Sequence, residues 1–377
     1  MAIKAKPNFS SKYQLFNKET TRELAASIKQ VSPEFDHAGF VRAALKGFKT
    51  RELKQRASWL VECLRPRLPE RFEDAAEILL GALPPPLDPT LTDNDFGRFI
   101  WGIPAEFVAE FGCSPHTLQQ SLNFLEESTK RFSAENPIRV FLNAYPQETM
   151  AYVRRWARDD NYHVRRLASE GIRPFLPWSP RISIPLADII EVLSTLHADN
   201  TRYVTRSVTN NLNDITKLAP ERVFDALKQW REEGRQTSAE LDWMTRHSLR
   251  TLLKLYDPRA LKLLGYHKPE IEFTDSHATD VVLVGDSFEW RGKVTALESQ
   301  KLLLTLRVHF LKANGQHSTK VFALKDLQMA RGETLDIVKK IPFKPITTRV
   351  LYPGKHFVEL AANGEIQAQC EFDLRTA

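Results

Sequence analysis

Charged and aromatic residues gather in one segment of the sequence, "DDNYHVRRLASEGIRPFLPW", from Asp159 to Trp178. Trp156 precedes Asp160 by four residues, so both side chains could point from the end of one helix into a groove. A tryptophan face attracts a cation, and a nearby carboxylate could stabilise a positively charged sugar and orient water. That chemistry would cut a glycosidic bond to a cationic leaving group. The alternative is that Trp156 belongs to the core and Asp160 caps the next helix.

The same segment carries a polar stripe. His163, Arg166, Glu170 and Arg173 follow one another at spacings of three, four and three residues, so they share one face of a helix. Arg165 adds a second cation beside Arg166. We expect this face to line a concave groove. The alternative is a solvated face with an ion pair between Arg166 and Glu170.

An internal repeat places two more stripes beside the first. "VRRLASEGI" from Val164, "VTRSVTNNL" from Val204 and "MTRHSLRTL" from Met244 follow at intervals of forty residues. A period near forty is typical of HEAT or armadillo helix pairs, which stack into a curved solenoid. We therefore expect the stripes to lie side by side. The further members of this predicted surface are Arg206, Asn210, Asn213, Lys217, Arg246, His247 and Arg250.

The chemical types in these stripes suit a polyanion. The segment "TNNLND" places three asparagines inside a predicted helix, where each costs roughly half a kcal/mol against alanine. Arginine, lysine and asparagine side chains bind phosphate oxygens and can position a duplex without reading its sequence. The stripes therefore predict a DNA-binding groove, although a solenoid that binds acidic proteins on its concave face would show a similar pattern.

The elements around the stripes divide the chain into two predicted domains. Residues 1–265 show helical periodicity, interrupted by the proline-rich loop "PPPLDPTLTD", whereas short strand-like runs begin near Lys268. Asn-Gly pairs at Asn314 and Asn363 predict two hairpins. We expect a mostly α protein, with a HEAT-like solenoid over residues 1–265 and a small immunoglobulin-like β-sandwich over residues 268–377.

Composition sets broad limits. The 377 residues carry a net charge of +6, a mild preference for polyanionic partners. No long apolar run or signal-peptide core occurs in the sequence, so we expect a cytoplasmic protein without a membrane span. Cys63, Cys113 and Cys370 are far apart and fit no zinc spacing, which suggests reduced, buried thiols.

The segments that carry this pattern resemble a known family. "DDNYHVRRLASEGIRPFLPW", "TRYVTRSVTNNLNDITKLAP" and "WMTRHSLRTLLK" resemble signature segments of the AlkC-type DNA alkylation-repair glycosylases, whose superfamily of HEAT-like repeat glycosylases also contains the AlkD type. "HFLKANGQHSTKVFALKDL" and "FKPITTRVLYPGKHFVELAANG" are similar to the immunoglobulin-like domain of some AlkC members. The resemblance covers most of the chain and is densest after about residue 135.

The resemblance implies a monofunctional glycosylase that excises N3-methyladenine and N3-methylcytosine from duplex DNA. It implies a monomer without metal or cofactor, associated with the bacterial nucleoid, that does not extrude the base into a deep pocket. Trp156 and Asp160 before Arg165 and Arg166 match the Trp-x-x-x-Asp element of the AlkD type, which would make them catalytic with Glu170. Asn213 stands where the AlkD type has an arginine. The rival interpretations are a non-catalytic binder of damaged DNA and a protein-interaction scaffold.

Overall fold

The computed structural model describes residues 11–90, 96–344 and 350–376. Their contacts divide the chain into two compact units, residues 1–248 and 249–377. The change from helices to strands falls between Leu263 and Ile271, close to the predicted domain boundary. The compact units nevertheless separate earlier, between Ser248 and Leu249, so that the last two short helices belong to the second unit.

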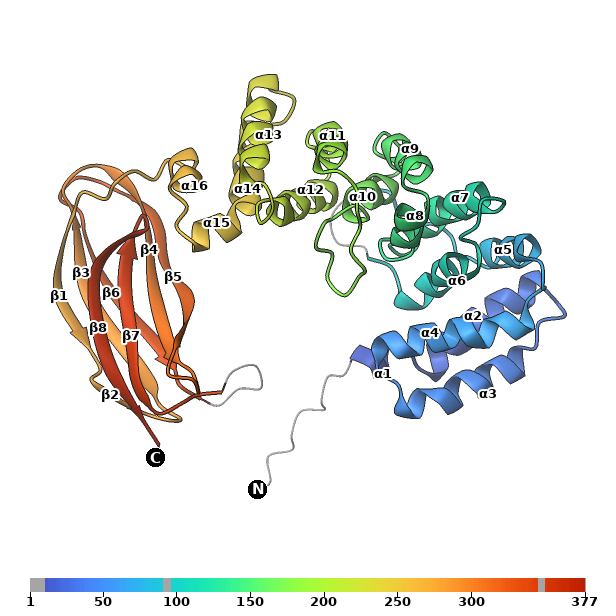
Figure 1. Cartoon of the computed structure of the whole chain (residues 1–377), viewed down its shortest axis with the longest axis horizontal. Coiled ribbons are helices and arrows are strands. Elements are labelled where there is room, and N and C mark those ends of the chain that lie inside the picture. Colours follow the sequence, from blue (N-terminus) through green and yellow to red (C-terminus); the bar gives the residue numbers. More distant parts are fainter. Residues whose placement is uncertain (1–10, 91–95, 345–349, 377) are drawn as a thin grey trace. The chain divides into compact units, whose positions relative to one another are not determined.

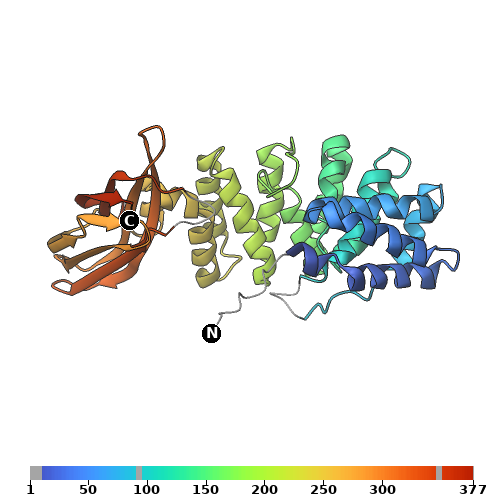
Figure 2. The same ribbon diagram turned by 90° about the horizontal axis from the view of Figure 1, so that it is seen from below.

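The first unit consists of α-helices joined by short loops (Figure 1). Figure 2 shows them following one another in chain order along the unit. Their bounds are α1 Ser11–Leu15, α2 Lys18–Val31, α3 His37–Gly47, α4 Leu53–Leu64, α5 Phe72–Gly81, α6 Ile103–Phe111, α7 Leu118–Thr129, α8 Ile138–Ala144, α9 Pro146–Trp156, α10 Tyr162–Glu170, α11 Leu186–Leu196, α12 Arg202–Ile215, α13 Pro220–Glu233 and α14 Ser238–Ser248.

The repeat predicted from the sequence corresponds to helix pairs. The segments from Val164, Val204 and Met244 lie in α10, α12 and α14, which pack in that order. The helices α9, α11 and α13 form a second row next to them (Figure 1). The same turn precedes α10 and α12, because the Asp159 carboxylate accepts from the Asn161 amide and Asp199 accepts from Thr201, each at 2.8 Å. The HEAT-like reading of this region is therefore confirmed.

The second unit begins with α15, Arg250–Lys254, and α16, Pro258–Leu263, followed by two sheets. A three-stranded sheet has the order β1-β3-β6, and a five-stranded sheet has the order β2-β8-β7-β4-β5. Leu304, Phe288 and Trp290 belong to the apolar core that the sheets share. The strand bounds are β1 Ile271–Ala278, β2 Val281–Leu283, β3 Ser287–Ala296, β4 Gln300–Leu311, β5 His317–Met329, β6 Thr334–Pro342, β7 Gly354–Ala362 and β8 Glu365–Arg375.

Both predicted hairpins are present. The Asn314-Gly315 turn joins β4 to β5, and the Asn363-Gly364 turn joins β7 to β8. Asn363 and Gly364 both have positive φ, 46° and 89°, as a type I′ turn requires. Strand β2 pairs in parallel with β8, whereas the other neighbouring strands are antiparallel.

Two expectations from composition can be compared with the described residues. Within those ranges, no helix combines the length and apolar character that crossing a bilayer requires. All three cysteines are free, but only Cys63 is buried, because Cys113 and Cys370 keep partial contact with solvent. Burial raises the pKa of all three thiols, that of Cys370 to about 11, so they are poor nucleophiles near neutral pH.

Candidate active site

The predicted stripes lie on neighbouring helices. The hydroxyl oxygens of Ser207 on α12 and Ser169 on α10 lie 2.9 Å apart, and Asn211 donates to the Ser169 carbonyl at the same distance. Asn210 on α12 contacts His247 on α14, with 3.1 Å between the amide oxygen and Nε2. These contacts hold the three helices in register, as the forty-residue period predicts.

Arg166 is the centre of a compact charged cluster at the end of α10. Its Nη1 donates to the Glu135 carboxylate and to the Ser133 hydroxyl, each at 2.9 Å, and its Nη2 lies 3.8 Å from a Glu170 oxygen. Its guanidinium also lies over the Tyr203 ring, 4.7 Å from the centroid. Burial opposes the charge on Arg166, but Glu170 and Glu135 outweigh it and raise its pKa. One arginine thus bridges two carboxylates.

Glu170 is a buried carboxylate with strong partners. Arg173 donates to one of its oxygens and the Ser207 hydroxyl donates to the other, each at 2.6 Å. Burial disfavours ionisation, but the charges of Arg166 and Arg173 and the bond from Ser207 outweigh it, so the pKa of Glu170 lies below its usual value. Glu170 is therefore a fixed negative charge in a poorly hydrated site, where its field is strong.

Glu135 is the member of this cluster that solvent reaches. Its side chain is 25% exposed, compared with 14% for Arg166 and 5% for Glu170. Glu135 lies in the loop between α7 and α8, and Ser133 donates to the same oxygen that Arg166 binds. No helical period connects a loop residue to the stripe of α10, which is why the sequence analysis did not find it.

Three members of the predicted groove surface do not face solvent: Arg173, His163 and Asn213. All three are buried. Arg173 is held by Glu170 and by Asp214, whose carboxylate lies 3.0 Å from its Nε. The predicted spacing is correct, but this part of the shared face packs against α12 and the loop after α10 instead of facing solvent. Their burial argues against direct contact with phosphates, and a role of these three side chains in DNA binding stays a prediction.

Arg165 also has a structural role. Its Nε lies 2.5 Å from the Asp199 carboxylate, and its Nη1 donates to the carbonyls of Asp159 and Asp160 at 2.9 Å. It therefore joins the two equivalent turns that precede α10 and α12. Because its donors are used within the fold, it is not a member of the basic surface.

Trp156 and Asp160 do not form the pair predicted from their spacing. Trp156 is 0% exposed, and its Nε1 donates to Glu126 at 2.6 Å, so the ring belongs to the core and cannot contact a base. Asp160 is exposed in the turn before α10. Helix α10 adds roughly 12 Å of rise between Tyr162 and Glu170, at about 1.5 Å per residue. Asp160 and Glu170 therefore cannot act on the same sugar.

The remaining residues of the predicted stripes keep contact with solvent. Arg206 and Asn210 on α12 and Arg246 and His247 on α14 are half-buried. Lys217 is exposed, with its ammonium 3.4 Å from Asp214. Arg250 is half-buried in the second unit. In the first unit, the side chains that could still contact phosphates are Arg206, Asn210, Lys217, Arg246 and His247.

Trp178, the last residue of the segment that opened the sequence analysis, is a second residue that the sequence analysis missed. It is 82% exposed and has a left-handed backbone conformation with φ of 62°. That conformation costs a bulky residue about 1–2 kcal/mol, so the surrounding structure must hold it there. The hydroxyl of Ser179 donates to Asn136, the residue after Glu135. This bond places the loop that carries the exposed Trp178 ring beside the loop that carries Glu135.

Arg139 on α8 supports the loop that carries Trp178. This buried arginine donates to the carbonyls of Gly171, Arg173 and Pro180 at 2.8 to 2.9 Å. Burial and the nearby charges of Arg173 and Arg181 lower its pKa to about 10, so it stays protonated near neutral pH. The loop is therefore attached to the fold at both of its ends.

The arrangement combines two carboxylates, a bridging arginine and an exposed indole. Carboxylates in a poorly hydrated site stabilise a developing positive charge, and an exposed tryptophan can stack on a base or a sugar. The half-buried cations on α12 and α14 could bind phosphates nearby. The site is thus suited to a cationic reacting centre within a polyanion.

Comparisons with known proteins agree with this geometry. Residues 274–376 match a family model described as the C-terminal Ig-like domain of YhaZ. The protein YhaZ of Bacillus subtilis is 29% identical over 367 residues, covering 96% of this chain and 98% of YhaZ. The structure of the Pseudomonas fluorescens alkylpurine DNA glycosylase AlkC, bound to DNA with an abasic site analogue, aligns with a TM-score of 0.85. That alignment has 34% identity and covers 96% of this chain and 99% of AlkC. The chain therefore belongs to the AlkC family.

Proposed function

We propose that the protein is a DNA glycosylase of alkylation repair, hydrolysing the N-glycosidic bond of cationic N3-alkylated bases such as N3-methylcytosine and N3-methyladenine in duplex DNA. The observation that carries this proposal is the pair of carboxylates, Glu135 and Glu170, that share Arg166. Similarity to AlkC, whose structure contains DNA with an abasic site analogue, supports the same reaction. The protein acts as a monomer on duplex DNA and has no lyase step.

The proposed chemistry needs only electrostatic stabilisation and a placed water molecule. The bond between C1′ and the base nitrogen breaks, and its electron pair neutralises the cationic base, which leaves without prior protonation. Positive charge then develops on the sugar, where ionised carboxylates stabilise it. Water adds its oxygen to C1′ and releases a proton to a carboxylate or to solvent. The products are the free base and an abasic site.

Glu135 and Glu170 take different parts in this reaction. Glu135 has exposed surface and can approach the sugar, whereas Glu170 lies deeper and supplies a fixed charge through Arg166. Arg166 holds the Glu135 carboxylate in place and prevents the two negative charges from repelling each other. Asp160, at the other end of α10, is the rival carboxylate.

The site favours attack on the sugar of a nucleotide whose base stays close to the duplex. Glu135 and Trp178 both have atoms at the surface, so they can reach a sugar from a groove without a base entering a deep pocket. Trp178 would fill the space beside the lesion or stack on the base next to it. Arg206, Asn210, Lys217, Arg246 and His247 would hold the phosphates on either side.

The test is base release from duplexes with a single N3-methylcytosine or N3-methyladenine, compared with the matched undamaged duplex. Free methylated base, together with strand breakage only after alkali, is the expected result. Strand breakage without alkali would contradict the monofunctional mechanism. Salt-sensitive DNA binding without release of either base would overturn the proposed glycosylase activity and would indicate a damage-binding protein. Equal binding to unrelated polyanions would instead indicate a scaffold.

A further inference from the structure

We propose that Lys54 is a positioning residue that holds Trp178 in its DNA-contacting conformation, an inference that rests on the proposed function. Lys54 lies in the first turn of α4, and its ammonium donates to the backbone carbonyl of Trp178, 124 residues later in the chain. Lys54 would thus connect the N-terminal helices to the loop beside the Glu135 cluster without touching the reacting atoms.

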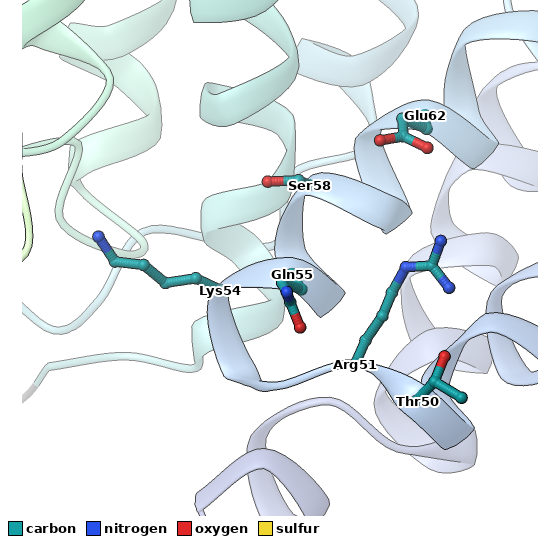
Figure 3. A pocket seen from close by; sticks show the side chains of 6 residues that line it. All are labelled: Thr50, Arg51, Lys54, Gln55, Ser58 and Glu62. Carbon is teal, nitrogen blue, oxygen red and sulfur yellow. The ribbon is translucent and has the colours of Figure 1, made fainter.

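The direction of the Lys54 side chain supports this role. Lys54 lines a shallow cavity of about 410 Å³ with Thr50, Arg51, Gln55, Ser58 and Glu62. Figure 3 shows that Lys54 extends away from Arg51 and Thr50, toward the neighbouring helices. Arg51 instead covers the Trp59 ring at 4.1 Å and donates to the Gly47 carbonyl. The two cations of this cavity therefore serve different parts of the fold.

The position of Lys54 in its helix also calls for an explanation. The positive end of the helix dipole lies at the N-terminus, where a lysine is disfavoured. Helix α4 gains nothing from a cation in its first turn, and Glu52 and Gln55 already provide its capping box. Glu106 on α6 has a pKa raised by burial, although the charge of Lys54 acts in the opposite direction. Lys54 thus donates to the Trp178 carbonyl, and its charge also acts on the Glu106 carboxyl.

Trp178 needs such a contact. Its left-handed φ of 62° is unfavourable for a large side chain, and its exposed ring has no core to hold it. On one side, Ser179 is tied to Asn136. The Lys54 ammonium fixes the carbonyl of Trp178 itself. Without Lys54, the loop keeps its attachment to Asn136 and Arg139, but the peptide after Trp178 is released.

The experiment is a double-mutant cycle with Lys54→Met and Trp178→Ala, measuring single-turnover release of N3-methylcytosine and affinity for a duplex with an abasic site analogue. We expect Lys54→Met to slow release by about 10-fold, as loss of one charge-assisted hydrogen bond can. Affinity should hold, and the double variant should release base no more slowly than Trp178→Ala, because Lys54 acts through Trp178. Lys54→Arg should restore release, and Lys49→Met, on an exposed lysine nearby, should behave as wild type.

Three results of the release and affinity measurements would overturn the inference. They are wild-type release by Lys54→Met, additive losses in the double variant, and a loss of affinity with a smaller salt dependence, which would make Lys54 a phosphate ligand.

Trp178 is the exposed one of the seven tryptophans, all of which lie in described ranges, so acrylamide quenching reports on it without base release. Bound DNA should protect Trp178 in the wild type and less so in Lys54→Met; equal protection would also contradict the inference. Failure of the wild type to release base would overturn the proposed function alone.

Discussion

The first unit buries charged side chains, whereas the second fills its core with apolar ones. Among the described residues, the arginines and acids that are nearly inaccessible to solvent all lie in the first unit: Arg56, Arg139, Glu170, Arg173 and Asp214. The buried polar side chains of the second unit are Thr305, His356 and Asn363. Its core cluster consists of hydrophobic residues.

The difference indicates what each unit is built to do. Burying ions is often no better for stability than burying hydrophobic residues of similar size, so buried charges suggest a role beyond folding. Glu170, Arg173 and Asp214 support Arg166 and the loop that carries Trp178.

The largest effect is expected from Arg173→Met. It leaves Glu170 and Asp214 buried without their shared cation, which should destabilise the first unit by about 3–5 kcal/mol. Urea denaturation measures this loss. Arg154→Met is the matched control, because Arg154 pairs with Asp188 and Glu191 at the surface and should change stability by only about 0–1 kcal/mol. Similar losses in the two variants would contradict the assignment of a buried network.

A smaller effect is expected from Asn363→Ala in the second unit. Asn363 is buried, donates to the carbonyls of His267 and Lys301, and accepts from the Leu303 amide at 2.8 Å. Its loss should destabilise this unit by about 1–3 kcal/mol. Asn314→Ala, in the exposed Asn-Gly turn, is the control and should stay within about 0.5 kcal/mol. A large loss from Asn314→Ala would show that the turns, and not the buried amide, determine stability.

The third prediction concerns pH. Burial lowers the pKa of His356, which stacks on Phe372 and bonds to the Tyr352 carbonyl and the Leu311 amide. A histidine with a lowered folded pKa stabilises the fold above its unfolded pKa of about 6.5, and this stability is lost as pH falls below that value. Unfolding measured on either side of about pH 6.5 should show a steeper loss in wild type than in His356→Phe. The exposed His277→Gln should keep the wild-type slope, and equal slopes in all three would contradict the prediction.

The regular parts of the molecule could be predicted from the sequence. The repeat indicated the packing of α10, α12 and α14, and the Asn-Gly pairs indicated both hairpins. Periodicity also indicated correctly that Glu170 lies beside Arg166 and Arg173, although Arg173 follows the end of α10. It could not show whether the predicted face meets solvent or another helix, because burial depends on the neighbour, and so it could not show that His163 and Arg173 are buried. Glu135 and Trp178 lie in loops, where no period connects them to the stripe.

The most direct test of the central claim is the single-turnover rate of base release from N3-methylcytosine duplex by Glu135→Gln, Glu170→Gln and Asp160→Asn, each at saturating enzyme. The proposed site predicts a fall of about 100-fold or more for Glu135→Gln, a marked fall for Glu170→Gln, and a nearly unchanged rate for Asp160→Asn, with DNA affinity held in all three. A large loss in Asp160→Asn, with wild-type rates in the two glutamate variants, would place the chemistry at the opposite end of α10 and contradict this account.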